Sequence, residues 1–330
     1  MSTSPATIAN TANVLTKPRA VLDIGSNTIR LLIAQTTAQG FKTIHYEHHI
    51  ARLGEGLQRT GMLGAAGQQR ALQVLQQVAH VCQQHHIQVN HIHAVATAAV
   101  REASNGADFV HTVQQQTKLI IRIISGQEEA HLALKGATLG LPAAVSQDML
   151  LFDIGGGSTE FTRVKDGQIV DAISLKLGVI RLTEQFLHSD PPSSQHYQVL
   201  KQQTQPFISQ LEQFWGNNTA LPASLVGTAG TVTTLAAIAQ DLSHYQAISI
   251  NGYGLSKVNF MQLKQQLCTQ TNQQRLLIPL LEKGREDVII AGLAIIESLF
   301  ERWGYQALTA VDSGLLEGLL LQQPSTTTSS

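Results

Sequence analysis

Apolar residues are distributed along this chain in two alternating patterns. Short uninterrupted runs predict strands that are buried on both faces, and apolar positions spaced three or four residues apart predict amphipathic helices. Strands are expected at 19–24, 29–35, 41–52, 91–97, 119–124, 149–154, 224–227 and 307–311. Helices are expected at 66–86, 108–118, 127–136, 179–187, 195–215, 288–303 and 314–321, and from residue 232 onwards. Strands that alternate with helices along a chain indicate an α/β fold.

The second half of the chain repeats the layout of the first half. Residues 20–30 and 149–161 each contain an apolar strand, the triplet Asp-Ile-Gly, a turn of small residues and the start of another strand. An internal repeat of this size predicts two related α/β domains. We expect them at 18–129 and 130–313, with a helix at 314–322 that packs back on the first domain. The polar ends, 1–17 and 323–330, are expected to be a disordered leader and a disordered tail.

Composition narrows the class of protein. Of the 330 residues, 43% are hydrophobic and 14% are charged, which suits two buried cores and argues against a disordered chain. The net charge of −1 argues against a nucleic-acid partner. No apolar run approaches the roughly 20 residues that span a bilayer, and Cys82 and Cys268 form no disulfide framework. We therefore expect a cytoplasmic protein without a membrane or nucleic-acid partner.

Each copy of the repeat places a carboxylate before a turn of small residues. In the first copy Asp23 is followed by Gly25, Ser26, Asn27 and Thr28. In the second copy Asp153 is followed by Gly155, Gly156, Gly157, Ser158 and Thr159, and then by Glu160. Small residues let backbone N–H groups converge on an anion, and an aspartate can hold Mg²⁺. The first copy alone also fits an ordinary strand-ending turn, whereas the pair predicts two loops that face each other and bind one phosphate chain from both sides.

A third turn connects a strand to the start of a helix. It contains Gly227, Thr228, Gly230 and Thr231. A helix N-terminus offers free backbone N–H groups to an anion. A tight strand-to-helix turn needs no ligand, however, so both interpretations stay open for this segment.

Charged residues near two other strand ends are further candidates. Glu128 and Glu129 open a helix, where one of them is suited to act as a general base, although acidic residues there also complement the helix dipole. Arg101 follows a strand end and either binds a phosphate or forms a surface ion pair. Arg30 and Arg52 are further candidates for a phosphate contact, although a structural role is favoured for each.

These motifs occur together in one protein family. The segments that carry the likeness are 23–28 (DIGSNT), 96–103 (ATAAVREA), 124–130 (ISGQEEA), 153–160 (DIGGGSTE), 227–231 (GTAGT), 285–292 (REDVIIAG) and 313–318 (SGLLEG). The sequence resembles the short, two-domain form of the Ppx/GppA phosphatase family, in the superfamily of acetate kinase, sugar kinases, Hsp70 and actin. The resemblance implies two actin-like (ribonuclease H-like) α/β lobes with a cleft between them. Leu316 stands where the family usually has arginine, so no role is assigned to it.

The resemblance also implies an activity. It implies removal of the terminal phosphate from inorganic polyphosphate, with pppGpp 5'-phosphohydrolase as the alternative. A sensor that binds guanosine polyphosphates with little catalysis is the second alternative, and a kinase of the superfamily is a further one. The implied cofactor is Mg²⁺, with Mn²⁺ as the alternative ion, and a homodimer is compatible with the resemblance.

The resemblance assigns roles to individual residues. Glu129, Glu160 and Arg101 form the implied catalytic set, in which Glu129 is the base that orients the attacking water. Asp153 and Glu160 are implied as ligands of the metal and its water, and Asp23 is their counterpart in the first loop. Arg101 is implied as the cationic partner of the phosphate cradle.

Overall fold

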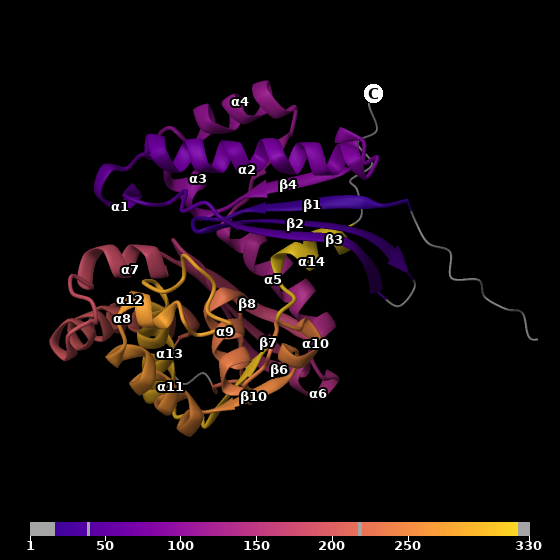
Figure 1. The fold of residues 1–330 in the computed structure, drawn as a ribbon. Helices are drawn as coiled ribbons and strands as arrows, with labels where there is room; N and C mark the ends of the chain where they lie inside the picture. The colour runs from indigo at the N-terminus through magenta and orange to yellow at the C-terminus, as the bar shows by residue number, and fades with distance from the viewer. Residues whose placement is uncertain (1–16, 38–39, 217–219, 323–330) are drawn as a thin grey trace, which may run out of the picture.

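The computed structural model describes residues 17–37, 40–216 and 220–322 of the chain. Within these ranges the chain forms two lobes, each built on its own β-sheet (Figure 1). The leader expected at 1–17 and the tail expected at 323–330 lie outside the described residues, apart from Lys17. No helix in these ranges is long and apolar enough to cross a membrane.

The first lobe carries a five-stranded sheet with the order β3-β2-β1-β4-β5. Its strands are β1 (Arg19–Ile24), β2 (Thr28–Thr37), β3 (Gly40–Ile50), β4 (Ile92–Ala96) and β5 (Ile121–Ile123). Strands β1, β2 and β3 are antiparallel neighbours, whereas β4 and β5 run parallel to β1. The remaining elements are α1 (Leu57–Thr60), α2 (Ala65–Gln84), the 3₁₀ turn η1 (Val89–His91), α3 (Ala98–Glu102) and α4 (Gly106–Thr117). Apolar residues of α2, α3 and α4 pack on the sheet and form the core of this lobe.

The second lobe carries a six-stranded sheet with the order β10-β11-β9-β6-β7-β8. Its strands are β6 (Asp148–Ile154), β7 (Thr159–Lys165), β8 (Gln168–Leu175), β9 (Ser224–Thr228), β10 (Tyr253–Ser256) and β11 (Ala307–Ala310). The series β8-β7-β6-β9-β11 has the same order and directions as β3-β2-β1-β4-β5, and β10 adds an antiparallel edge strand. The predicted α/β class and the internal repeat are therefore confirmed.

A layer of helices covers one face of the second sheet. Its members are α7 (Val179–Phe186), α8 (Ser194–Trp215), α9 (Ala229–Ala239), α10 (Ala247–Ile250), α11 (Lys257–Thr269), α12 (Asn272–Arg275) and α13 (Ile289–Trp303). Helix α13 is the centre of this layer, because its residues from Ile289 to Phe300 are all buried. Burial of this predominantly apolar helix accounts for much of the core of the lobe.

Helices α5 (Gly126–Gly140) and α14 (Leu315–Leu321) lie side by side between the two sheets (Figure 1). Helix α5, which is followed by α6 (Ala143–Gln147), packs on β7 and β8, and α14 packs on β1 and β2. Gly136 and Gly318 allow the close approach, because a Cβ atom at either position would overlap a backbone carbonyl of the facing segment. Leu316 is buried in the same layer, so burial against apolar neighbours accounts for a leucine there. Helix α5 continues across residues 129 and 130, and the domain limits therefore stay a prediction.

Candidate active site

The two Asp-Ile-Gly loops have the same local structure. Gly25 donates its backbone N–H to the carbonyl of Thr28 at 2.9 Å, and Gly155 donates its N–H to the carbonyl of Ser158, also at 2.9 Å. Each turn directly follows a strand that carries the aspartate, Asp23 on β1 and Asp153 on β6. The equivalent strands of the repeat therefore present equivalent carboxylates to the space between the lobes.

The two loops also contact each other. A Cβ atom on Gly156 would lie 3.0 Å from the Cβ of Ser26, and one on Gly157 would lie 2.7 Å from the Oγ of Ser26. The glycines of the second loop were expected to allow a ligand to approach the backbone. In this structure they also allow the first loop to approach, because a larger side chain would separate the lobes.

A cavity of about 100 Å³ lies between the lobes. The predicted residues on its wall are Asp23, Gly25, Ser26, Asn27, Thr28, Glu129, Asp153, Gly155, Gly156, Gly157, Ser158, Gly230 and Thr231. Polar residues that the sequence analysis did not place there are Arg30, Thr97 and Arg285. Arg285 lies in one of the family segments, which was the signal available for it, whereas a structural role was favoured for Arg30.

One carboxylate oxygen of Asp23 accepts hydrogen bonds, and the other has no partner among the described residues. Its Oδ2 accepts hydrogen bonds from Arg30, at 3.1 Å from Nε and 2.7 Å from the terminal nitrogen. Its Oδ1 is buried and has no hydrogen-bond partner among the described residues, and the same holds for Oδ1 of Asn27. Buried polar oxygens are normally hydrogen-bonded. Two such oxygens on one cavity wall therefore point to a bound water, ion or substrate as their partner.

Asp153 has a perturbed ionisation. Burial raises the pKa of Asp153, Arg30 opposes this rise and the charge of Asp23 adds to it, and the resulting pKa is about 6. A neighbouring cation or a bound metal ion would favour the charged form. A cation that enters the cavity would therefore oppose the effect of burial on the pKa of Asp153.

Glu129 is held at the start of α5 and is only 8% exposed. Its Oε2 accepts a hydrogen bond of 2.9 Å from Arg101, which also donates to the carbonyl of Ile124 at 2.9 Å. Burial raises the pKa of Glu129 well above its usual value; the negative charge of Glu160 raises it further, and Arg101 opposes both. Arg101 thus contacts Glu129 and is absent from the cavity wall, so the structure does not bring it to the phosphate cradle.

Glu128 has a different environment from its neighbour. It forms an ion pair of 2.5 Å with Arg122, its side chain is 32% exposed, and it is absent from the cavity wall. Of the two acidic residues that the sequence left open, the structure therefore brings Glu129 to the cavity.

Glu160 lies on β7, behind the cavity wall. Its Oε1 accepts hydrogen bonds from Ser158 at 2.7 Å and from Ser174 at 2.6 Å. Burial and the charge of Asp153 raise the pKa of Glu160, the serine hydrogen bonds oppose the rise, and the resulting pKa is about 7. Glu129 and Glu160 therefore form a pair of buried carboxyl groups in which ionisation of one disfavours ionisation of the other.

The turn after β9 carries a backbone outlier at the cavity. Ala229 adopts a left-handed conformation with φ of 67°, and Ala229, Gly230 and Thr231 all lie on the wall. Gly230 faces the guanidinium of Arg285, which a Cβ atom at 230 would overlap. The strained turn therefore brings the start of α9 close to a cavity-lining cation.

Three of the predicted phosphate contacts, Thr159, Gly227 and Thr228, lie off the cavity wall. Thr159 donates its hydroxyl to the carbonyl of Leu177. Gly227 packs against the ring of Phe152, which a Cβ atom would approach to 2.6 Å. Thr228 is the residue that precedes α9. None of these three residues lies on the cavity wall, so the structure does not bring them to the cavity.

Comparison with known proteins identifies the family. A model of the Ppx/GppA phosphatase family matches residues 32–326. The chain belongs to the Ppx/GppA phosphatase family. Exopolyphosphatase 2 of Mycobacterium tuberculosis is 31% identical over 319 residues, which cover 92% of this chain and 97% of that protein. The predicted family is confirmed, and this Ppx/GppA chain is a phosphohydrolase.

Solved structures of the family share the fold. An exopolyphosphatase from Cytophaga hutchinsonii matches with a TM-score of 0.84 at 27% identity, covering 92% of this chain and 96% of that one. The Ppx/GppA family member of Aquifex aeolicus matches with a TM-score of 0.75 at 27% identity, covering 91% of this chain and 95% of that one. The predicted two-lobed, actin-like arrangement of this phosphatase is therefore confirmed.

Ion pairs connect the lobes of this phosphatase around the cavity. Arg52 of the first lobe contacts Asp287 of the second at 2.6 Å. Arg285 donates to Nε2 of His48 on β3 at 3.0 Å, and Nδ1 of His48 lies 2.7 Å from Glu282. These contacts involve one short segment of the second lobe, residues 282–287, which therefore supplies both a cavity residue and polar contacts between the lobes.

Proposed function

We propose that this Ppx/GppA phosphatase removes the terminal phosphate of inorganic polyphosphate by hydrolysis. The observation that carries the proposal is Glu129, a buried carboxyl group with a raised pKa on the wall of a cavity between two anion-binding loops. The names of the relatives, two of which are exopolyphosphatases, support the same substrate class.

In the proposed reaction Glu129 orients the attacking water and accepts its proton. Arg101 fixes the carboxyl group through Oε2, which leaves Oε1 as the acceptor for the water. A base with a pKa near the working pH transfers protons well in both directions. The water attacks the terminal phosphorus in line, the bond to the bridging oxygen breaks, and the shortened chain leaves with that oxygen.

The phosphate chain is held by charge and by backbone N–H groups. Phosphoryl transfer needs little covalent chemistry from a protein, so positioning and charge neutralisation dominate. The two loops and the start of α9 all line the cavity, where their free backbone N–H groups would bind phosphate oxygens, and Arg285 adds a positive charge. Arg101 contributes indirectly, because its contact is with Glu129.

The cavity also suits a magnesium ion. Mg²⁺ usually binds through one or two carboxylates and keeps waters and substrate phosphates as its other ligands. The described residues contain no group of three or more acidic, histidine or cysteine side chains arranged to hold a metal, but Asp23 has a buried oxygen without a partner. We propose that Asp23 and Asp153 hold the ion. When bound, the ion neutralises charge on the phosphate oxygens.

Glu160 is proposed to act through Glu129. Its Oε1 already accepts two serine hydrogen bonds, and the side chain lies off the cavity wall. We therefore assign it the role of tuning the charge of Glu129, in place of the metal ligand that the family resemblance implies.

Phosphate release by the purified protein tests the proposal. Long polyphosphate, tripolyphosphate and pppGpp are compared side by side with Mg²⁺, against a baseline in EDTA. The proposal predicts release from polyphosphate that exceeds release from pppGpp. Preference for pppGpp would assign the same site to guanosine polyphosphates, and binding without release from any of the three would support a sensor.

A further inference from the structure

A buried arginine lies next to the segment that reaches the cavity. Arg275, the last residue of α12, is 1% exposed, which is rare for a charged side chain. A buried charge is costly unless it is paired and hydrogen-bonded, so the partners of Arg275 show which parts of the chain it connects.

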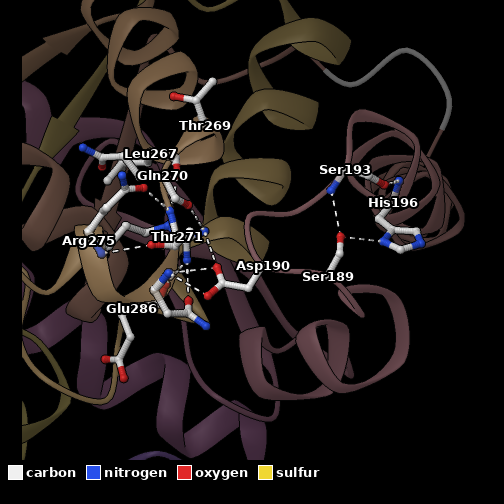
Figure 2. Close-up of polar contacts among 12 residues, drawn as sticks. Ser189, Asp190, Ser193, His196, Leu267, Thr269, Gln270, Thr271, Arg275 and Glu286 are labelled. Atoms are coloured by element: carbon white, nitrogen blue, oxygen red, sulfur yellow. Dashed lines mark hydrogen bonds and ion pairs between the residues drawn. The ribbon is translucent and has the colours of Figure 1, made fainter.

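The guanidinium of Arg275 donates hydrogen bonds to three backbone carbonyls and one side-chain oxygen. Nε donates to the carbonyl of Leu267 at 3.0 Å, and one terminal nitrogen donates to the carbonyl of Gln270 at 2.8 Å. The other terminal nitrogen donates to Oδ1 of Asn272 at 2.7 Å and to the carbonyl of Glu286. Figure 2 shows Arg275 surrounded by these partners. The guanidinium therefore fixes the end of α11 relative to the segment that leads into α13.

A carboxylate completes the arrangement. Asp190 lies 3.9 Å from the Arg275 guanidinium and accepts the backbone N–H of Asn272 at 2.8 and 3.0 Å (Figure 2). Asp190 thus holds the start of the helix whose last residue is Arg275. Both ends of this short helix are fixed by charged groups.

The carbonyl that Arg275 holds belongs to Glu286, which lies between a cavity residue and a residue of the contact between the lobes. Arg285, before Glu286, lies on the cavity wall and reaches His48, while Asp287, after Glu286, pairs with Arg52 of the first lobe at 2.6 Å. Moving the peptide of Glu286 would move both side chains. We propose that Arg275 is a positioning residue that holds Arg285 in the phosphate cavity and Asp287 in the contact between the lobes.

The inference rests on the proposed function, because the position of Arg285 matters only if the cavity binds phosphate. Arg275→Lys keeps the charge, but a single ammonium cannot reach four acceptors in the geometry of a guanidinium. We expect the KM for polyphosphate to rise about tenfold and kcat to change less than about twofold, since Glu129 is untouched. Binding of tripolyphosphate, measured by calorimetry, should weaken by the same factor.

A double-mutant cycle separates positioning from a general loss of stability. In an Arg285→Ala background, Arg275→Lys should weaken tripolyphosphate binding by less than about twofold further. The matched control is Thr204→Val, which removes a buried hydrogen bond of 2.7 Å to Ser298 between α8 and α13. It should lower the melting temperature without changing tripolyphosphate binding.

Several results would overturn the inference. One is a double variant whose loss of tripolyphosphate binding equals the product of the losses in Arg275→Lys and in Arg285→Ala. Another is a loss of tripolyphosphate binding in Thr204→Val that is as large as the loss in Arg275→Lys. If Arg275→Lys does not fold, Asn272→Ala replaces it, because this change removes one acceptor of the Arg275 guanidinium. Asn272→Ala should weaken tripolyphosphate binding about two- to threefold when Arg285 is present and not when it is absent. An equal loss of binding in the Arg285→Ala background would overturn the inference. Wild-type protein that binds tripolyphosphate without releasing phosphate contradicts the proposed function alone, and wild-type protein that does not bind it contradicts both.

Discussion

Replacing Glu160 by glutamine should change how the stability of the protein depends on pH. The amide keeps an oxygen in the place of Oε1, so the hydrogen bonds from Ser158 and Ser174 can persist. Because burial raises the pKa of Glu160 from 4.5 to about 7, the folded protein retains this proton at pH values where the unfolded chain has lost it. The stabilisation that comes from this retained proton is fully present below pH 4.5 and is lost as the pH rises through about 7.

The size of the effect follows from the shift. A rise from 4.5 to about 7 corresponds to about 3 kcal/mol of folding free energy. We therefore expect the free energy of unfolding of Glu160→Gln, relative to that of the wild type, to increase by up to about 3 kcal/mol between pH 4.5 and pH 8. The same change should lower the pKa of Glu129, because the charge of Glu160 helps to raise it. The acid limb of the rate profile should then move to lower pH.

Urea unfolding of the metal-free protein measures the stability change. The fluorescence of Trp215 and Trp303, the only tryptophans, reports on the second lobe, where their rings lie 5.2 Å apart. The matched control is Glu212→Gln, because hydrogen bonds from Arg302 lower the pKa of Glu212. That variant should lose stability relative to the wild type as the pH rises above the unfolded-state pKa. A Glu160→Gln gain that is the same at pH 5 and pH 8 would refute the reasoning, since it would mean that Glu160 titrates normally.

Three further changes test the site. Arg101→Met should slow phosphate release about 10- to 100-fold and move its acid limb to higher pH, because Arg101 orients Glu129 and lowers its pKa; an unchanged pH profile would contradict this. Gly230→Ala should raise the KM for polyphosphate about tenfold by displacing Arg285, whereas Gly254→Ala, which has open space around it, should not. EDTA should abolish release and Mg²⁺ restore it, with Asp153→Asn needing at least about tenfold more Mg²⁺; activity that persists in EDTA would exclude the proposed ion.

Many of the buried strands and longer helices could be predicted because their patterns are local, although the helix α11 was not expected. The runs at β1 and β6 are almost entirely buried, and the turns after them have the hydrogen bond expected of a tight small-residue turn. Strand β8 lacked such a signal, because most of its residues are only half-buried. The short helices α3 and α12 were also missed, since helices of five or four residues contain too few positions to show a period.

The roles of charged residues depended on contacts between distant parts of the chain. The spacing of Glu128 and Glu129 does not distinguish them, but Arg122 and Arg101 pair with them separately in the folded protein. The cavity position of Arg285 likewise follows from Gly230, far away in the sequence. Sequence motifs therefore located the site, whereas tertiary packing determined which polar groups reach it.

Phosphate release by Glu129→Gln tests the central claim most directly. The account predicts that this variant folds, binds tripolyphosphate as the wild type does, and releases phosphate from polyphosphate about 10²- to 10⁴-fold more slowly. Glu128→Gln, a change to the neighbouring residue outside the cavity, should retain wild-type release. Release by Glu129→Gln at the wild-type rate, from protein of normal stability, would contradict the assignment of Glu129 as the base.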